Sequence, residues 1–237
     1  MRTLLYVPVI HTRADLGSLA KDVAERGTKD LGEELWRRHE EVVNVFWDTV
    51  INYFDSREAG GFKIYQDGML ADGEMGQKIV DEGVKSGSKN YEIVSRLLQK
   101  GAILVRTEEL ALVAEERDRL IKITRAKTIP RKLLLLIKYK LTKNRLLNKR
   151  DKFIARRIDE TLNQGETGVI FIGACHNVKK RLPVDISIVE IKDIDKVREY
   201  QMLLPFYNKH NHRIEELTKY LISEVKYPAN PEEVSSL

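Results

Sequence analysis

Residues 169–176 read Val-Ile-Phe-Ile-Gly-Ala-Cys-His, and this stretch decides the fold class. A short, continuous apolar run of β-branched and aromatic residues is typical of a strand that is covered on both faces, as in a parallel sheet. Gly173 opens a turn in which the backbone can come close to a ligand. The stretch therefore predicts a buried strand whose carboxyl end presents His176.

Working outward, other apolar runs predict four more strands, at Leu4–Ile10, Phe62–Tyr65, Ala102–Val105 and Asp185–Ile191. Pro8 lacks an amide proton and fits best at a sheet edge or a bulge. Helical patterns separate the strands, and this alternation is typical of parallel strands joined by crossovers. We therefore predict an α/β fold, with a mainly parallel sheet, helices on both faces and extra C-terminal helices.

Helical spacing of apolar residues places the predicted helices between these strands. The predicted ranges are 16–24, ending near Gly27, then 31–54, 75–84, 91–98, a helix around 110–113, 131–162 with a break near Asn148, and 203–225. No low-complexity linker divides the chain. We expect a single domain over 1–227 and a loose tail over 228–237.

The composition is that of a globular protein. The chain has 237 residues, 42% of them apolar and 32% charged, which fits neither a disordered nor a membrane protein. Its apolar runs are too short to span a bilayer, and its N-terminus lacks the cleavage site of a secretion signal. A single cysteine, Cys175, excludes an internal disulfide and indicates a reducing compartment. We expect a soluble, cytoplasmic protein.

The net charge of +5 is concentrated in one segment. Residues 131–157 carry eleven Lys and Arg against one Asp, a net charge of +10, which leaves −5 for the rest of the chain. The segment either binds an anionic partner or is a solvated amphipathic helix, and we favour the second reading. Its aromatic residues are only Tyr139 and Phe153, so we do not expect it to bind nucleic acid. In the favoured reading its apolar residues pack inward, namely Leu133, Leu134, Leu136, Ile137 and Leu141.

Ligands of open α/β sheets bind beyond the carboxyl ends of the strands. That rule selects His11, Thr12, Asp67, Arg106 and His176. We expect His11, His176 and Asp67 to converge, either as acid–base groups or as ligands of a divalent metal such as zinc, iron or manganese. The alternative for each histidine is packing or helix capping.

Five positions have both a chemical and a structural interpretation. Asp67 and Glu74 flank a glycine-rich loop, and either is the acidic partner of the histidines or a turn residue. Asp151 caps a helix that opens near Asn148, and Arg150 either clamps an anionic substrate group or is a surface charge. Cys175 is read as a packing residue rather than a nucleophile.

The segments 150–158, Arg-Asp-Lys-Phe-Ile-Ala-Arg-Arg-Ile, and 169–177 together resemble the TraB, Tiki and ChaN-type superfamily, which includes erythromycin-esterase-like proteins. Gly173-Ala174-Cys175-His176 matches its late Gly-x-x-His, and Arg150-Asp151 matches its helix motif. The first motif departs, because Pro8 stands where the family has Gly before His11. The resemblance implies an α/β fold with a carboxylate at Asp67 or Glu74. Members include proposed metalloproteases, ester hydrolases and a haem-binding type.

Two functions follow from these readings. The first is a metal-dependent hydrolase for a small molecule or peptide, with His11, His176 and Asp67 as catalytic residues and with His11 and His176 as metal ligands. Arg150, Asp151 and Glu74 would then bind substrate. The alternative is a non-catalytic protein that binds a small ligand or an anionic partner. Either is compatible with a homodimer, in which the helices at 130–165 and 203–225 would pair between subunits.

Overall fold

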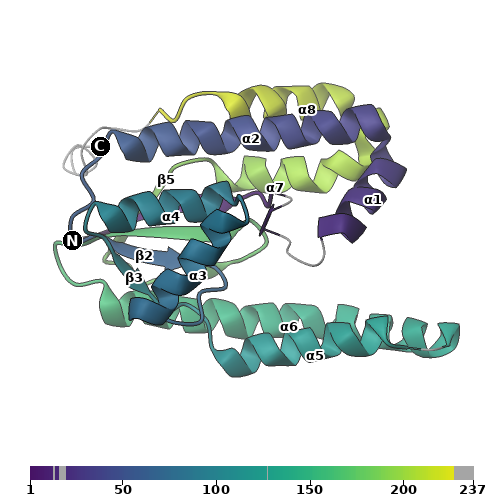
Figure 1. Cartoon of the computed structure of the whole chain (residues 1–237), viewed down its shortest axis with the longest axis horizontal. Coiled ribbons are helices and arrows are strands. Elements are labelled where there is room, and N and C mark those ends of the chain that lie inside the picture. Colours follow the sequence, from purple (N-terminus) through teal and green to yellow (C-terminus); the bar gives the residue numbers. More distant parts are fainter. Residues whose placement is uncertain (13, 16–19, 127, 227–237) are drawn as a thin grey trace.

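A computed structural model describes residues 1–12, 14–15, 20–126 and 128–226, and Figure 1 shows their α/β arrangement. Five parallel strands form one sheet in the order β3-β2-β4-β1-β5. The predicted fold class and the five predicted strands are confirmed. Their bounds are β1 (Arg2–Val9), β2 (Lys63–Gln66), β3 (Ile103–Val105), β4 (Thr167–Gly173) and β5 (Ile186–Glu190).

Helices occupy most of the connections between strands. They are α1 (Ala20–Leu31), α2 (Glu33–Asp55), α3 (Gly73–Lys85), α4 (Lys89–Gln99), α5 (Leu110–Thr124), α6 (Ile129–Thr161), α7 (Ile194–Leu203) and α8 (Tyr207–Ile222). The extra C-terminal helices are present as α7 and α8. Helix α1 continues through Gly27 to Leu31, beyond its predicted end. Residues 16–19, where that helix was predicted to begin, and the predicted tail at 228–237 lie outside the described residues.

Alternation along the central strands builds a core on each face of the sheet. Leu5 and Phe171 point to one face, where they pack with buried residues of α2, α4 and α8. Tyr6 and Ile170, their neighbours along the strands, point to the other face and pack with buried residues of α6. Because both faces of β1 and β4 are covered, these strands are apolar along most of their length, which is the pattern that the sequence shows.

Pro8 lies in an interior strand, contrary to its predicted place at an edge or bulge. Strand β1 pairs with β4 on one side and β5 on the other. The Tyr6 carbonyl accepts a hydrogen bond from the Ile191 amide on the β5 side. Two residues on, Pro8 faces that same side, but the β5 pairing has already ended at Tyr6. The missing amide proton of Pro8 therefore removes no bond from the sheet.

Helix α6 is continuous over Ile129–Thr161, so the predicted break near Asn148 is wrong. Past Pro130 the helix contains neither Gly nor Pro, and one Asn in a helix costs only a fraction of a kcal/mol, ~0.7 or less. Its second half lies under the sheet, while its first half runs beside α5 and projects past the sheet (Figure 1). The Arg119 guanidinium links the two helices by donating to the Thr142 hydroxyl at 2.6 Å.

The projecting half of α6 also corrects the predicted packing of its apolar residues. Leu133, Leu134, Ile137 and Leu141 are exposed rather than packed inward. The side chain of Leu136 lies outside the described part of the structure. The inward reading fails because the segment lies beyond the sheet, beside α5 (Figure 1).

Within the described residues, no helix is both long enough and apolar enough to cross a membrane.

Candidate functional site at the carboxyl edge of the sheet

The candidate site forms where β2 and β4 end side by side. These strands are parallel neighbours, with Gln66 opposite Phe171, so the residues that follow them meet at one edge. The amide of Asp67 donates to the Phe171 carbonyl at 2.8 Å, which holds Asp67 against β4. After β4, a turn closed by the His176 amide and the Gly173 carbonyl, at 3.0 Å, presents the imidazole of His176. Asp67 and His176 therefore lie together at this edge, as the sequence predicts.

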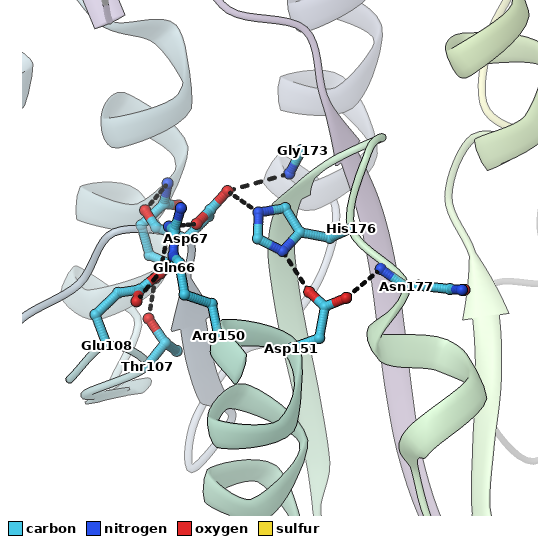
Figure 2. Close-up of polar contacts among 9 residues, drawn as sticks. All are labelled: Gln66, Asp67, Thr107, Glu108, Arg150, Asp151, Gly173, His176 and Asn177. Atoms are coloured by element: carbon cyan, nitrogen blue, oxygen red, sulfur yellow. Dashed lines mark hydrogen bonds and ion pairs between the residues drawn. The ribbon is translucent and has the colours of Figure 1, made fainter. Parts of the chain in front are cut away.

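His176 is held between two carboxylates, as Figure 2 shows. Its Nδ1 lies 2.6 Å from Oδ1 of Asp151, and its Nε2 lies 3.3 Å from Oδ2 of Asp67. The second oxygen of Asp151 accepts from the Asn177 amide at 2.9 Å. His176 is 4% exposed and Asp151 is 2% exposed. The shorter contact with Asp151 therefore fixes the ring, and the longer contact faces Asp67.

Arg150, the residue before Asp151 in α6, extends this arrangement. Its Nη2 donates to Oδ1 of Asp67 at 2.9 Å, and its Nε donates to Oε1 of Glu108 at 3.0 Å. Glu108 is fully buried. The result is a chain of alternating charge, Asp151–His176–Asp67–Arg150–Glu108, which we call the charge chain. It joins α6 to the ends of β2 and β4 and to the loop after β3.

Burial and pairing act in opposite directions on the pKa values of this chain. Burial lowers the pKa of His176, but its hydrogen bonds to Asp151 and Asp67 outweigh burial and raise the pKa to about 10. Burial raises the pKa of Asp67, but the contact with His176 and the charge of Arg150 hold it well below its usual range. Burial also raises the pKa of Glu108, even though Arg150 donates to it. At neutral pH, His176 is an imidazolium and Asp67 is ionised.

Glu108 is a member that the sequence reading missed. The rule for strand ends selected Arg106, which directly follows β3, whereas Glu108 comes two residues later. The amides of Thr107 and Glu108 both donate to the Met69 carbonyl at 3.0 Å, and this turn directs Glu108 inward. Arg106 instead lies over the Phe153 ring, at 6.0 Å from its centroid. A search that included the second and third residues after each strand would have found Glu108.

The roles predicted for Arg150 and Asp151 change in the structure. Asp151 lies inside α6 and caps no helix, because α6 begins at Ile129 rather than near Asn148. Its carboxylate is used by His176 and Asn177 instead. Arg150 was predicted to clamp an anionic substrate group, but its donors are directed at Asp67 and Glu108. Both side chains therefore take part in the charge chain.

His11 lies apart from the charge chain. It is exposed at the end of β1 and lines a hollow of about 540 Å³. Thr12, Trp36, His39 and Lys89 line the same hollow. His176 borders a different hollow, of about 680 Å³, together with Cys175. The two histidines that were expected to share one ligand therefore face different spaces.

Asp15 forms hydrogen bonds of its own beside the hollow of His11. Asp15 accepts from the Thr12 amide at 2.6 Å and from the Thr12 hydroxyl at 2.8 Å, and Ser88 donates to its other oxygen. Burial, followed by the charges of Asp15 and Asp67, raises the pKa of Tyr91. Because β1 and β4 are parallel and Val9 lies opposite Gly173, the hollow and the charge chain belong to the same edge of the sheet.

Glu74 and Cys175 take no part in the charge chain. Glu74 is exposed in the first turn of α3, so of the two carboxylates that flank the loop, Asp67 is the one beside His176. Cys175 is exposed, which contradicts its predicted role in packing. It borders the hollow beside His176 because the turn after β4 directs it outward.

The residues present do not fit a metal ion. In the described part of the chain, no group of three or more His, Cys, Asp or Glu side chains is arranged to hold one. A histidine binds metal through a neutral ring nitrogen, whereas both nitrogens of His176 face carboxylates. The charge of the imidazolium already balances the acidic side chains that a metal would otherwise balance.

Two buried side-chain oxygens among the described residues lack a hydrogen-bond partner, Oε1 of Gln66 and Oδ1 of Asn90. Gln66 directly precedes Asp67 and is 3% exposed. An unpaired buried acceptor costs about 1–3 kcal/mol. Gln66 is therefore a polar group of this edge that a bound molecule or water would stabilise.

Comparisons with protein-family models, with curated proteins and with solved structures found no match to this chain. The resemblance to the TraB, Tiki and ChaN-type superfamily therefore stays a prediction, and the site is interpreted from its own geometry.

Proposed function

We propose that this protein is a hydrolase that uses acid–base chemistry without a metal, with Asp67 and His176 as its reacting pair. One observation carries the proposal. His176 is fixed through Nδ1 by Asp151 at 2.6 Å, while its Nε2 faces Asp67 across a longer contact of 3.3 Å. A base–acid pair oriented by a third group is the arrangement that proton transfer requires.

The resting pKa values of the pair support a role that begins when substrate binds. Each group stabilises the charge of the other, and so the pKa of His176 lies at about 10 and that of Asp67 well below its usual range. A substrate and a water molecule that separate the pair would weaken this stabilisation. The pKa of His176 would then fall and that of Asp67 would rise, toward the neutral values at which acid–base catalysis is effective.

In the proposed reaction, water attacks the carbonyl carbon of an ester or amide and gives its proton to a carboxylate oxygen of Asp67. The Nε2 proton of His176 passes to the leaving oxygen or nitrogen. Asp67 then returns its proton to His176, which restores the ion pair. The overall change is the addition of one water molecule across the broken bond.

We assign substrate binding to the hollow of about 680 Å³ that His176 borders. It combines apolar walls, including Leu182 and Ile188, with polar groups such as that of Asn177, as small-molecule sites do. This mixture suits an uncharged molecule of modest polarity. Because Arg150 already faces two carboxylates, an anionic substrate is not favoured.

The test compares hydrolysis by the wild type with hydrolysis by Asp67→Asn and His176→Gln. A panel of chromogenic esters, amides and phosphate esters would be used, with a chelator present throughout. We expect carboxyl-ester or amide hydrolysis that the chelator leaves unchanged. Each substitution should reduce kcat by about a hundredfold or more, the range of a lost acid or base.

Glu74→Gln is the matched control, because Glu74 is an exposed carboxylate outside the charge chain. It should keep wild-type activity. Thermal unfolding of every variant separates lost chemistry from lost folding. If no substrate of the panel is hydrolysed, or if the Asp67 variant remains active, the proposal is wrong.

A non-catalytic binding role is the second candidate, and one observation favours it. Every charged group of the charge chain already faces an opposite charge, as in a rigid support for a neighbouring pocket. In that case ligands of the His11 hollow would raise the unfolding temperature without being turned over. For either function we propose a cytoplasmic location, since the chain carries a single cysteine.

A further inference from the structure

The outer half of α6, residues 129–149, exposes a row of large apolar side chains. Leu133 is 57% exposed, Leu134 66%, Ile137 50% and Leu141 78%. Their spacing places them on one side of the helix, within an arc of about 100°. Monomeric proteins rarely leave such a contiguous row in water, and one bordered by polar residues is typical of an interaction surface.

Basic side chains border this row along one edge. Arg131, Lys138 and Arg145 recur every seven residues and are all exposed. That spacing keeps them on one side of the helix, next to the apolar row. The edge continues along the inner half of α6 with Lys152 and Arg156, which are also exposed. Helices α5 and α6 form a helical hairpin, and we call the apolar row with its basic edge the hairpin face.

Cations also gather at the tip of the hairpin that α5 and α6 form. Lys122, Arg125 and Arg131 line a hollow of about 690 Å³ there, with Asp118 as its acidic member. An excess of positive charge around a hollow suits a phosphate group. The tip therefore adds an affinity for anions to the apolar row.

The hairpin of α5 and α6 projects from the rest of the molecule. Arg150 and Asp151 stand at the carboxyl edge of the sheet, so residues 129–149 of α6 extend beyond that edge by about 30 Å at 1.5 Å per residue. Figure 1 shows α5 and α6 projecting together, clear of the other helices. The hairpin is thus separated from the other helices along its outer length (Figure 1).

We propose that the hairpin face docks on an anionic lipid surface, with the apolar row at the level of the acyl chains and the basic edge among the headgroups. A helix with an apolar face and Lys or Arg beside it lies in the membrane interface in this way. The charge complements the occupant, because residues 131–157 carry a net charge of +10. This docking is peripheral and independent of the proposed hydrolase activity.

Other occupants fit the face less well. A second copy of the chain would bring two segments of +10 together, and their repulsion opposes pairing. Nucleic acid would satisfy the charges but would leave four large apolar side chains against phosphates and water. An anionic bilayer satisfies both features at once.

The test is sedimentation of the full-length protein with phosphatidylcholine vesicles, with and without phosphatidylglycerol as the anionic lipid. The apolar variant carries Leu134→Ser, Ile137→Ser and Leu141→Ser. The basic variant carries Arg131→Gln, Lys138→Gln and Arg145→Gln. Because all of these residues are exposed, neither variant should lower the unfolding temperature appreciably.

We expect the wild type to sediment with the anionic vesicles and to stay in the supernatant when the vesicles are neutral. The basic variant should bind roughly a hundredfold more weakly, at about 1 kcal/mol for each cation near the surface. The apolar variant should bind at least about tenfold more weakly. Added salt should release the wild type.

Two matched controls use exposed residues elsewhere on the molecule. One carries Met75→Ser, Met202→Ser and Phe206→Ser, and the other carries Lys78→Gln, Lys85→Gln and Lys209→Gln. Both should bind like the wild type. Equal binding to neutral vesicles, no binding to anionic ones, or equal losses in the controls would overturn the proposal. So would a dimer in solution that the apolar variant abolishes.

Discussion

The two halves of α6 are one continuous helix with opposite surroundings. In the inner half, residues 150–161, Ile154 and Ile158 are buried against the sheet, and Arg150 and Asp151 belong to the charge chain. In the outer half, residues 129–149, the large side chains Leu134 and Leu141 face solvent. Apolar content does not explain the difference, since the exposed outer half is the richer in Leu and Ile. The halves differ in their position relative to the sheet. The sheet ends at the level of the charge chain, so the inner half packs against it and the outer half lies beyond it.

This comparison shows how one helix can hold a site and extend away from it. Its inner half is fixed from three sides by groups at the ends of β2, β3 and β4. Its outer half runs beside α5 and projects past the sheet (Figure 1). Equivalent substitutions in the two halves should therefore have very different effects.

The largest effect is expected from Arg150→Met. This change leaves Asp67 and the fully buried Glu108 without their shared cation. Removing one member of a buried ion pair costs about 3–5 kcal/mol of unfolding free energy. Urea unfolding followed by circular dichroism would measure the loss. Lys138→Met replaces an exposed cation of the outer half by the same residue, and its unfolding free energy should stay within about 0.5 kcal/mol of the wild type.

Similar losses for Arg150→Met and Lys138→Met would contradict the contrast between the halves. If Glu108 accounts for most of the cost, the double variant Arg150→Met/Glu108→Gln should recover part of it, because a neutral side chain is cheaper to bury than an unpaired carboxylate.

A smaller difference is expected from truncating one isoleucine in each half. Ile158 is fully buried under the sheet, so Ile158→Ala should cost about 2–4 kcal/mol through lost packing and a cavity. Ile137 is 50% exposed, so Ile137→Ala should change the unfolding free energy by about 0.5 kcal/mol or less. The same urea titration measures both. A loss above 2 kcal/mol at Ile137 would show that the outer half has a partner in solution.

The smallest expected effect is a pH dependence that belongs to the inner half. The pKa of His176, about 10, lies above its ordinary value of 6.5. Its imidazolium therefore stabilises the folded protein fully below pH 6.5, and this contribution is lost as the pH rises toward 10. Between pH 7 and 9 the loss should be on the order of 2 kcal/mol.

The measurement is the difference in unfolding free energy between the wild type and His176→Gln across that range. Subtraction is needed because burial lowers the pKa of Lys192 to about 8, and this adds stability as the pH rises. A difference that stays constant from pH 7 to 9 would mean that His176 is neutral in the folded protein.

Much of the fold could be read from the sequence. Five strands and a parallel sheet follow from short apolar runs separated by helical patterns, and all are present. The order of the strands, and with it the place of Pro8, could not be read, because pairing depends on contacts between distant segments. For the same reason, the sequence pattern did not predict how far α6 extends beyond the sheet or that its leucines are exposed.

The candidate site was predictable only in part. The strand-end rule brought Asp67 and His176 together correctly, since neighbouring parallel strands end at one edge. It does not say where each side chain points, so it joined His11 to His176 although they face different hollows. It also missed Glu108, and it could not show that Arg150 and Asp151 would face inward from the middle of a helix.

The strand order also has a consequence for how the chain is made. Strand β1 pairs only with β4 and β5, so it has no partner strand until Thr167 and the residues after it have been synthesised. At typical elongation rates that interval lasts roughly ten to thirty seconds. During it, the ribosome carries an apolar strand that nothing in the sheet can cover. Completion of the central strand, rather than of any earlier unit, is thus the event that commits this protein to its fold.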